Sequence, residues 1–321
     1  MSLLTTLIDP PLALRRSDPS DQFETVVDPV RKTDESHPQS LLRVGLIGFG
    51  RTGRDVAKLL LTDKTMCLEW VLRRSDTLEH RSVPEFLGLD SDEPGVIHSA
   101  TQISARDLLD RFPVDVIIDF SSESGLDYYG EEAAARGIAI VTAISRYSEA
   151  KQRQLERHAR MTRVLWSPNI TLGINFMLLA AQTLKRIAPG VDVQIVEEHF
   201  RDKAEVSGTA LRLARALDTP DDSVHVIRAG GIIGIHEVLF GFPAQTVRLR
   251  HEAISREAFG NGAMFAARHL VDRGAGLYRM EDLLLPYFAD QEGAGVGHEQ
   301  RRGGMRGRLA SRLRAVARRL D

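Results

Sequence analysis

The stretch from residue 197 to residue 210, EEHFRDKAEVSGTA, places acids, bases and a histidine just before a Ser-Gly-Thr sequence and the helix-like segment LRLARAL. A helix that begins after Ser207 would present unpaired backbone amides and the positive end of its dipole. Such a helix start is a natural binding site for an anion. A solvated surface loop would also carry these charges, but it would not need the Ser-Gly-Thr sequence. The stretch therefore predicts an anion site at Ser207, Gly208 and Thr209.

A second motif, VGLIGFGRTGRDVAKLL, contains Gly48, Gly50 and Gly53 in the pattern G-x-G-x-x-G, after a strand-like run and at the start of a helical pattern. In dinucleotide-binding proteins the first glycine allows a tight turn, the second lets the backbone approach a pyrophosphate, and the third lets the helix pack on the sheet. Glycines that merely mark a turn are the alternative. We expect a cofactor site that also includes the intervening residues Phe49, Arg51 and Thr52.

The next strand-like run, LEWVLRRSD, ends in Arg73, Arg74 and Ser75 and lacks an acid until Asp76. An acid at this place usually binds the ribose of NAD, whereas arginine accommodates the 2′-phosphate of NADP. Two guanidiniums and a hydroxyl suit a phosphate, because arginine forms charge-assisted, bidentate contacts with it. The sequence therefore favours NADPH, with NADH as the alternative. Paired arginines at a strand end are also common as a solvated edge.

The elements that must position these residues follow two different patterns. From Leu42 to about residue 168, β-rich runs alternate with helical patterns, which is typical of βαβ units. After Pro168 a long apolar helix pattern precedes four strand-like runs. We expect an α/β protein with a Rossmann-type doubly wound parallel sheet and a second α+β domain that carries a mixed sheet. The expected ranges are 42–168 plus 255–290 for dinucleotide binding, and 169–254 for substrate binding and oligomerisation.

The two ends of the chain have a different composition. Residues 1–41 contain scattered prolines and charges without a sustained period, which predicts a flexible extension. Residues 291–321 form a basic tail with an arginine-rich helical pattern. One face of that pattern would carry Leu309, Leu313, Val316 and Leu320. We expect the tail to be a surface element that does not take part in catalysis.

Composition excludes several classes of protein. With 43% hydrophobic and 27% charged residues, the 321-residue chain has a globular composition and room for two domains. Lys plus Arg (42) nearly balance Asp plus Glu (44), so we expect no nucleic-acid partner. The single cysteine, Cys67, excludes an internal disulfide and fits a reducing compartment. No apolar run reaches the roughly 18 residues of a membrane span, and we expect a cytoplasmic protein.

Several further segments follow one another in a distinctive order. DVIIDFSS is strand-like and ends in Asp-Phe-Ser, and SPNITLGINFMLLA contains the pattern Pro-Asn-x-x-x-Gly-x-Asn. RAGGIIGIHEVLF contains Arg-x-Gly-x-x-x-Gly-x-His, and HEAISREAFGNGAMFAARHL precedes GLYRMEDLL. Over about residues 43–286 this order resembles the bacterial dihydrodipicolinate reductases (4-hydroxy-tetrahydrodipicolinate reductase). The resemblance implies an NAD(P)H-dependent reductase of the lysine and diaminopimelate pathway, commonly a tetramer, that transfers hydride to a carboxylate-bearing cyclic imine or enamine.

The resemblance also assigns roles to residues. The family signature Glu-x-His-His-x-x-Lys-x-Asp-Ala-Pro-Ser-Gly-Thr-Ala matches this chain at Glu197, His199, Lys203 and residues 207–210. It implies that His199 or Lys203 handles a proton, and that Lys203 with residues 207–209 holds a substrate carboxylate. This agrees with the chemistry, because an imine that receives hydride becomes basic and needs a positioned proton donor. The resemblance adds four residues to the cofactor site, namely Phe120, Ser121, Thr142 and Asn169.

The chain departs from the family pattern within the signature itself. Phe200 replaces the second histidine if His199 matches the first, and one residue is missing between Lys203 and Ser207. Without that gap, His199 matches the second histidine and Lys203 has no counterpart. Asp-Ala-Pro is replaced by residues 204–206, Ala-Glu-Val, and the Gly-Thr-Thr-Gly beside the nicotinamide by residues 141–144, Val-Thr-Ala-Ile. Two alternatives therefore stay open: an imine reductase or amine dehydrogenase with a different substrate, and a non-catalytic nucleotide-binding redox sensor.

Other polar residues have simpler interpretations. His236 is expected to be structural, and Glu197 and Glu198 are expected to face solvent or to pair with arginines. No His, Cys or Asp cluster has the chain spacing of metal ligands, so the sequence predicts no metal site. The expected partners are a small carboxylate-bearing substrate and further copies of the chain in a tetramer or dimer.

Overall fold

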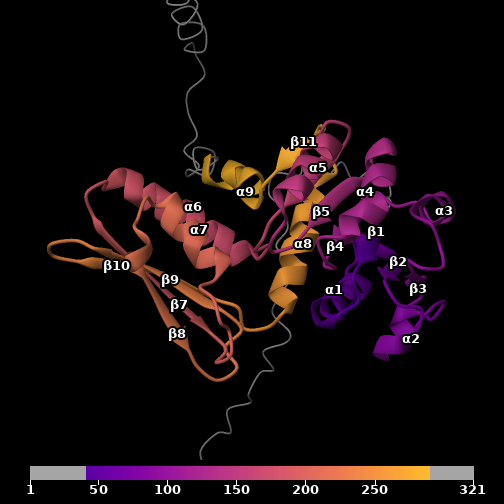
Figure 1. Ribbon diagram of the computed structural model, residues 1–321, viewed down its shortest axis with the longest axis horizontal. Coiled ribbons are helices and arrows are strands. Elements are labelled where there is room, and N and C mark those ends of the chain that lie inside the picture. The colour runs from indigo at the N-terminus through magenta and orange to yellow at the C-terminus, as the bar shows by residue number, and fades with distance from the viewer. Residues whose placement is uncertain (1–40, 290–321) are drawn as a thin grey trace, which may run out of the picture. The chain divides into compact units, whose positions relative to one another are not determined.

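The computed structural model describes residues 41–289, which contain two β-sheets (Figure 1). Three expectations from the sequence lie outside these residues. They are the N-terminal extension, apart from its last residue, the basic tail, and the apolar face of that tail at Leu309, Leu313, Val316 and Leu320.

The first sheet has seven strands, and every neighbouring pair is parallel. The strands are β1 (Leu42–Ile47), β2 (Met66–Arg73), β3 (Val96–Ser99), β4 (Val116–Asp119), β5 (Ala139–Thr142), β6 (Arg163–Trp166) and β11 (Gly276–Tyr278). Their order is β11-β6-β5-β4-β1-β2-β3, so the chain reverses its direction across the sheet between β1 and β4. This order confirms the predicted Rossmann-type, doubly wound sheet, in which ligands bind at the carboxyl ends of the strands near the reversal.

Helices cover both faces of this sheet. They are α1 (Arg51–Thr62), α2 (Val83–Leu87), α3 (Ala105–Arg111), α4 (Gly125–Ala135), α5 (Glu149–Ala159), α8 (Glu257–Leu270) and α9 (Met280–Ala289). Val116 and Ile118 of β4 belong to the apolar core that α1, α8 and α9 cover, whereas Ile117 belongs to the core under α3, α4 and α5. Successive side chains of a strand point to opposite faces. Both faces therefore need apolar residues, which explains the unbroken apolar runs.

The second sheet contains β7 (Asp192–His199), β8 (Val224–Arg228), β9 (Ile235–Gly241) and β10 (Thr246–Glu252) in the order β10-β9-β7-β8. β7 and β8 are parallel and the other pairs are antiparallel, which confirms the predicted mixed sheet. Helices α6 (Leu172–Ile187) and α7 (Gly208–Ala216) lie over it in Figure 1, and a short 3-10 helix spans Asp221–Ser223. Leu178 of α6 and Leu213 of α7 share a buried core with Ile195 and Phe240 of the sheet.

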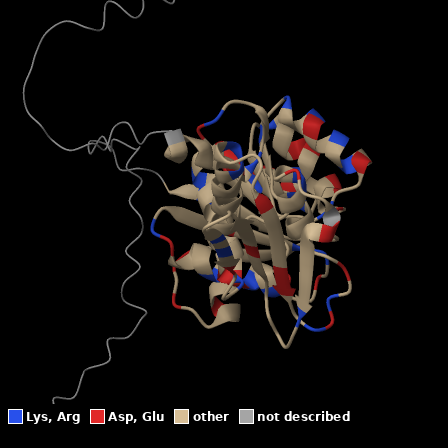
Figure 2. Ribbon diagram, turned by 90° about the vertical axis from the view of Figure 1, so that its left-hand side faces the viewer, with Lys and Arg blue, Asp and Glu red and all other residues tan. Residues whose placement is uncertain are grey.

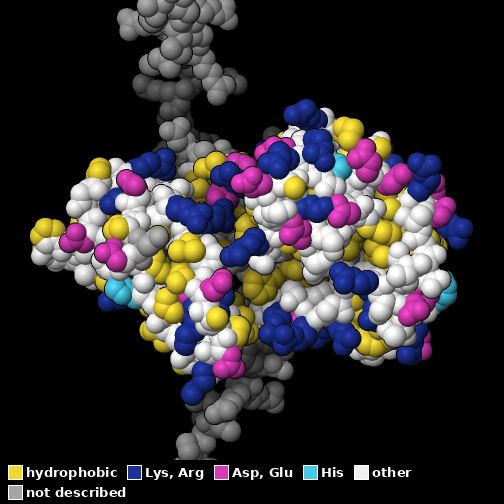
Figure 3. All heavy atoms as spheres, viewed as in Figure 1, with side chains coloured by type: hydrophobic (Ala, Val, Ile, Leu, Met, Phe, Trp, Pro, Cys, Tyr) yellow, Lys and Arg dark blue, Asp and Glu magenta, His cyan; other side chains and the backbone are white. Residues whose placement is uncertain are grey.

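Charged side chains of both signs are interspersed over the surface. In Figure 2 basic and acidic residues occur on the same helices and loops, and in Figure 3 the visible face mixes them with apolar side chains. Within residues 41–289, no helix is both long and apolar enough to cross a membrane.

The strand β11 joins the first sheet although it follows the second sheet in the sequence. The domain boundaries given above stay a prediction.

Asp119 ends β4 with a side chain that has no exposed surface. Its Oδ1 accepts hydrogen bonds from the backbone N and the hydroxyl of Ser121, at 2.8 and 2.6 Å, and its Oδ2 accepts one from the hydroxyl of Tyr129 at 2.9 Å. Burial raises the pKa of Asp119 to about 6, although these hydrogen bonds act in the opposite direction. The carboxyl group therefore fixes the course of the chain as it leaves β4, at an electrostatic cost.

We expect Asp119→Asn to change how stability depends on pH. The folded protein binds the Asp119 proton more tightly than the unfolded chain, so the stabilisation from protonation is complete below about pH 4 and is lost as pH rises through about 6. The shift corresponds to at most about 3 kcal/mol. Urea unfolding of both proteins between about pH 4 and 8 should show that the free energies of unfolding diverge by up to this amount in favour of the variant. Parallel pH profiles would contradict the assignment.

Candidate active site

The turn after β1 has the geometry that the glycine motif predicts. Gly48 has a φ of +96°, and a Cβ atom there would lie 2.8 Å from the backbone of Phe120. A Cβ on Gly53 would lie 2.0 Å from the carbonyl oxygen of Gly48, so only glycine lets α1 approach the turn this closely. By contrast, apart from Gly50 itself and the two adjoining residues, no atom lies within 4 Å of a Cβ built on Gly50, which precedes α1. The open space at Gly50 leaves room for a ligand beside the helix start.

A cavity of about 430 Å³ lies at the carboxyl ends of β1, β2 and β4. Seven of the predicted cofactor residues line it: Gly48, Phe49, Gly50, Arg73, Arg74, Ser75 and Ser121. Sequence reasoning missed five other polar or small residues in its wall: Ala100, Ser122, Ser124, Gly125 and Tyr128. Ser122 directly follows the Asp-Phe-Ser pattern after β4, and Ser124 lies two residues further on, so this pattern was the available signal. The cavity is at the reversal of strand order, where this fold binds nucleotides.

Arg73 and Arg74 stand at the wall of this cavity without a counter-ion. Among residues 41–289, no carboxylate pairs with either guanidinium. Their backbone is held in place, because Ala100 N donates to Arg73 O at 2.8 Å and the Ser99 hydroxyl donates to Arg74 O at 3.2 Å. Arg74 is exposed and Arg73 is half-buried. Two unpaired cations on a fixed backbone can bind an anionic ligand in the cavity.

Six predicted cofactor residues do not line the cavity: Arg51, Thr52, Gly53, Phe120, Thr142 and Asn169. Gly53 is buried where α1 packs on the turn. Thr142 has no exposed surface, and its hydroxyl lies 2.8 Å from the hydroxyl of Tyr147. Asn169 Nδ2 donates a hydrogen bond to Thr209 Oγ1 at 3.1 Å, which places it next to the other predicted site. Their contact with a cofactor stays a prediction.

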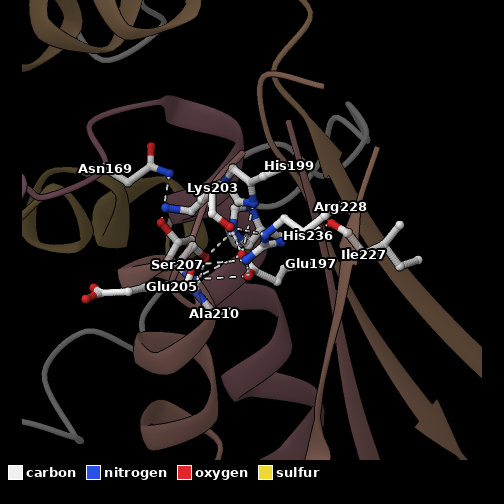
Figure 4. A network of polar contacts seen from close by, with 11 residues as sticks. Asn169, Glu197, His199, Lys203, Glu205, Ser207, Ala210, Ile227, Arg228 and His236 are labelled. Carbon is white, nitrogen blue, oxygen red and sulfur yellow. Dashed lines mark hydrogen bonds and ion pairs between the residues drawn. The ribbon is translucent and has the colours of Figure 1, made fainter. Parts of the chain in front are cut away.

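The second candidate site is built around the buried carboxylate of Glu197 (Figure 4). Arg228 Nη2 donates to its Oε1 at 2.6 Å, Ser207 N lies 3.2 Å from both oxygens, and His199 Nδ1 lies 3.0 Å from Oε2. Burial by itself would raise the pKa of Glu197, but the close approach of the His199 ring and the hydrogen bonds from Ser207 and Arg228 outweigh it and hold the pKa well below its usual range. Glu197 is therefore an ionised group that pairs with arginine, and the solvent-facing alternative is wrong for it.

The register of the second sheet brings these residues together. Glu197 and His199 are two positions apart on β7, so both side chains point to the same face. His199 pairs with Arg228 across β7 and β8, and Glu197 pairs with His236 across β7 and β9. Sequence reasoning did not place Arg228 or His236 in the site, because the pairing of strands cannot be read from chain spacing.

His236 and Ser207 connect this cluster to the start of α7. Ser207 Oγ lies 2.9 Å from His236 Nε2 and accepts a hydrogen bond from Ala210 N at 3.1 Å, which caps the helix. Burial lowers the pKa of His236 to about 3, so its ring is neutral. Within the described part of the chain, the backbone N–H groups of Gly208 and Thr209 have no hydrogen-bond acceptor. The predicted anion site at Ser207, Gly208 and Thr209 therefore has free donors.

Lys203 lies in the turn between β7 and α7. Its side chain is half-buried and forms no ion pair with the residues that the structure describes. Arg228 Nε donates to Lys203 O at 2.9 Å, and Arg228 Nη2 donates to Glu205 O at 2.9 Å, so the arginine fixes the backbone of this turn. Burial is the main cause of the lowered pKa of His236, and the charge of Lys203 acts in the same direction.

We expect Glu197→Gln to lower the free energy of unfolding by about 3–5 kcal/mol, because it leaves Arg228 largely buried without a counter-ion. The neighbouring Glu198→Gln is the matched control. Glu198 pairs with the half-exposed Arg250 at 3.4 Å, and such a pair contributes about 1 kcal/mol or less. Chemical denaturation of both variants makes the comparison. Equal losses in the two variants would show that Glu197 does not organise the site.

Comparison with known proteins places both halves of the chain in one family. Residues 42–170 match the family model "Dihydrodipicolinate reductase, N-terminus", and residues 171–284 match "Dihydrodipicolinate reductase, C-terminus". The chain is 34% identical over 192 residues to the 4-hydroxy-tetrahydrodipicolinate reductase of Caldanaerobacter subterraneus, an alignment that covers 53% of this chain and 76% of that protein. It is 30% identical over 260 residues to the enzyme of the same name from Nitratidesulfovibrio vulgaris, covering 73% of this chain and 95% of that protein.

Solved structures share the fold. The dipicolinate-bound dihydrodipicolinate reductase from Paenisporosarcina sp. TG-14 has a TM-score of 0.64 at 20% identity and covers 76% of this chain and 99% of its own. An amine dehydrogenase from Mycobacterium smegmatis has a TM-score of 0.54 at 13% identity, with 75% and 96% coverage, so at this identity the likeness concerns the fold alone. Because the two family models together match residues 42–284, this chain belongs to the dihydrodipicolinate reductase family.

Proposed function

We propose that this chain reduces a cyclic imine or enamine that carries carboxylates, with NADPH as the hydride donor, as in the reductase step towards diaminopimelate and lysine. The observation that carries the proposal is the arrangement at the start of α7. There the free amides of Gly208 and Thr209, the unpaired ammonium of Lys203 and the buried pair of His199 and Glu197 occur together. This arrangement combines an anion site with groups that can hold and move a proton.

A bound nicotinamide would supply the hydride, and the residues of this chain would supply the rest. The turn at Gly48 and Gly50 and the first amides of α1 would hold the phosphates. The space beside Gly50, where a side chain would lie, is open to them. The proposed cofactor site is completed by Phe49, Arg51, Thr52, Gly53, Arg73, Arg74, Ser75, Phe120, Ser121, Thr142 and Asn169.

Proton transfer would depend on the orientation of His199. Its Nδ1 faces Glu197, which leaves Nε2 as the nitrogen available to a substrate. A Cβ at position 234 would lie 3.2 Å from that Nε2, so Gly234 keeps the approach to it open. Lys203 would neutralise the substrate carboxylate or deliver the proton, and Ser207, Gly208 and Thr209 would bind the carboxylate. We therefore propose His199 and Lys203 as the catalytic residues.

The edge of the second sheet bears on how the enzyme assembles. The edge strand β8 exposes Val226 and Ile227, which are 42% and 46% accessible. An edge strand with apolar side chains is a natural pairing surface for another copy. We therefore propose a homo-oligomer, either a tetramer or a dimer, which light scattering of the purified chain can measure. A cytoplasmic location fits the free thiol of Cys67.

A different substrate on the same scaffold is the second candidate, and the turn at residues 204–206 favours it. Ala204, Glu205 and Val206 replace the family's Asp-Ala-Pro and are all exposed. A site that recognises a polar group discriminates strongly, so a changed donor set can change the substrate. NADPH oxidation with freshly made dihydrodipicolinate precursor, beside a panel of cyclic and acyclic imines, distinguishes the candidates. NADPH binding without turnover of any substrate would favour the redox-sensor alternative.

The cofactor preference gives a prediction. Replacing Arg73 and Arg74 together by Ala should weaken NADPH binding, because each charge-assisted contact to the 2′-phosphate contributes roughly 1.5 to 3 kcal/mol, or about 10-fold or more. NADH binding should change little, since NADH lacks that phosphate. Arg81→Ala is the matched control, because Arg81 pairs with Glu85 and does not line the cavity. Calorimetric titration with both cofactors measures the effect, and a wild type without preference for NADPH would contradict it.

The catalytic assignment gives another prediction. Lys203→Ala should lower kcat by about 10² to 10⁴, the range for a positioned proton donor, while NADPH affinity stays near that of wild type. Thr209→Val should mainly raise KM, because it removes one hydroxyl from the carboxylate site but keeps the backbone amides. Arg201→Ala, an exposed residue of the same turn, is the control. Full activity in both Lys203→Ala and His199→Ala would show that this stretch is a solvated loop.

A further inference from the structure

Glu79, His80 and His98 form a compact group at the edge of the first sheet, away from the Glu197 cluster. Glu79 and His80 lie between β2 and α2, and His98 is on β3. One ligand-type atom from each residue can be chosen so that all three lie within 4.8 Å of one another. The backbone holds the group together, since His80 N donates to Ile97 O at 2.8 Å and Ile97 N donates to Arg81 O at 2.9 Å.

His98 is buried without a hydrogen-bond partner. Its exposed fraction is 4%, and neither ring nitrogen finds a donor or acceptor among residues 41–289. Oε2 of Glu79 is likewise buried without a partner within that range. A buried polar atom that stays unsatisfied costs about 1–3 kcal/mol, so such atoms in a native protein require an explanation. Three of them on two adjacent side chains point to a missing ligand.

His80 completes the group from the solvent side. Its side chain is 77% exposed, and its Nε2 lies 3.7 Å from Oε1 of Glu79. The ring centroids of His80 and His98 are 6.0 Å apart. His80 also has a φ of +63°, a conformation that few residues other than glycine adopt. The exposed ring leaves a path from solvent to the buried nitrogens of His98.

Two imidazoles and one carboxylate are a ligand set for zinc-like transition metals. Zn²⁺ binds such ligands at about 2.0–2.2 Å in a tetrahedron, so ligand atoms lie about 3.4 Å apart. Because the ligand-type atoms of this group lie within 4.8 Å of one another, they would have to approach by up to about 1.4 Å to reach that spacing. The buried ring nitrogens of His98, which have no hydrogen-bond partner within residues 41–289, are of the kind that binds such metals. Mg²⁺ and Ca²⁺ prefer oxygen ligands and fit the group less well.

The other histidine and carboxylate group of the structure does not offer the same opportunity. Glu197, His199 and His236 also lie within ligand distance of one another. However, Arg228 and Ser207 already bind the Glu197 carboxylate, and a cation would have to displace the guanidinium. Spacing along the chain could not predict either group. In each of them, residues that are distant in the sequence come together only when the strands of a sheet pair.

We propose that Glu79, His80 and His98 bind one divalent transition-metal ion of the zinc type at the edge of the nucleotide cavity. The ion would join the segment that follows β2 to β3, with water in the fourth position. The site lies next to the cavity wall, because Ser99 follows His98 and its hydroxyl binds the carbonyl of Arg74. The prediction of no metal site, made from chain spacing, is therefore revised by this proposal.

Cobalt(II) is the probe for the test, because its visible absorption intensifies in tetrahedral sites. The 321-residue chain without an affinity tag, treated with chelator, is titrated with Co²⁺ and then with competing Zn²⁺. We expect one ion per chain. His98→Ala, His80→Gly and Glu79→Gln should each weaken binding about 100-fold or more, since even indirect partners of a metal ligand contribute about 10- to 100-fold. Glycine at position 80 keeps the backbone conformation, and His225→Ala, an exposed histidine on β8, should bind like wild type.

The buried position of His98 means that His98→Ala is the variant most exposed to a loss of folding. His80 is exposed and Glu79→Gln keeps the shape of the side chain, so these two variants decide the matter if His98→Ala unfolds. Equal Co²⁺ affinity in wild type and in the folded variants would overturn the proposal. Loss of the ion in His199→Ala, with full binding in the other variants, would assign it to the Glu197 group and also overturn the proposal. No tetrahedral Co²⁺ spectrum in wild type would do the same.

Discussion

The buried ion pair between Glu197 and Arg228 connects elements that are distant in the sequence. A carboxylate without exposed surface is stable only if hydrogen bonds and an opposite charge compensate its burial. Arg228 supplies the charge from β8, and it also donates hydrogen bonds to the carbonyl oxygens of Lys203 and Glu205. Ser207 N donates to the same carboxylate from the start of α7. The positions of Lys203 and of the predicted anion site therefore depend on one compensated charge.

The first turns of α1, which packs on the first sheet, and of α7, which packs on the second sheet, differ in the free backbone amides that they can offer to an anion. At α1 the preceding residue is Gly50, which has no side chain to cap the helix, so the first amides stay open to a phosphate. At α7 the hydroxyl of Ser207 already caps the amide of Ala210, so only the amides before it remain free. The first arrangement suits a large phosphate group that several amides contact, and the second suits a smaller carboxylate.

The features that sequence could predict are those that depend on neighbouring residues. The turn at Gly48, the alternation of strands and helices, and the helix start after Ser207 are all local, and the structure contains them. The cluster around Glu197 was not predictable, because Arg228 and His236 reach it only through the register of β8 and β9. The group of Glu79, His80 and His98 was not predictable either, because it forms through the pairing of β2 with β3. Sequence fixes which residues share a strand face, but the pairing of strands decides which faces meet.

The missing residue before Ser207 need not move Lys203. Arg228 holds the carbonyl oxygens of Lys203 and Glu205, and Lys203 N donates to Phe200 O, so backbone contacts close the shorter turn. The side chains at positions 204–206 are exposed and take no part in this closure beyond a long, solvent-exposed contact between Glu205 and Arg146. Ala-Glu-Val in place of Asp-Ala-Pro therefore changes the side chains that border the predicted site, while backbone contacts fix the turn that carries Lys203. If Lys203 matches the family's lysine, we expect any difference in substrate from other members of the family to arise from side-chain chemistry at this border.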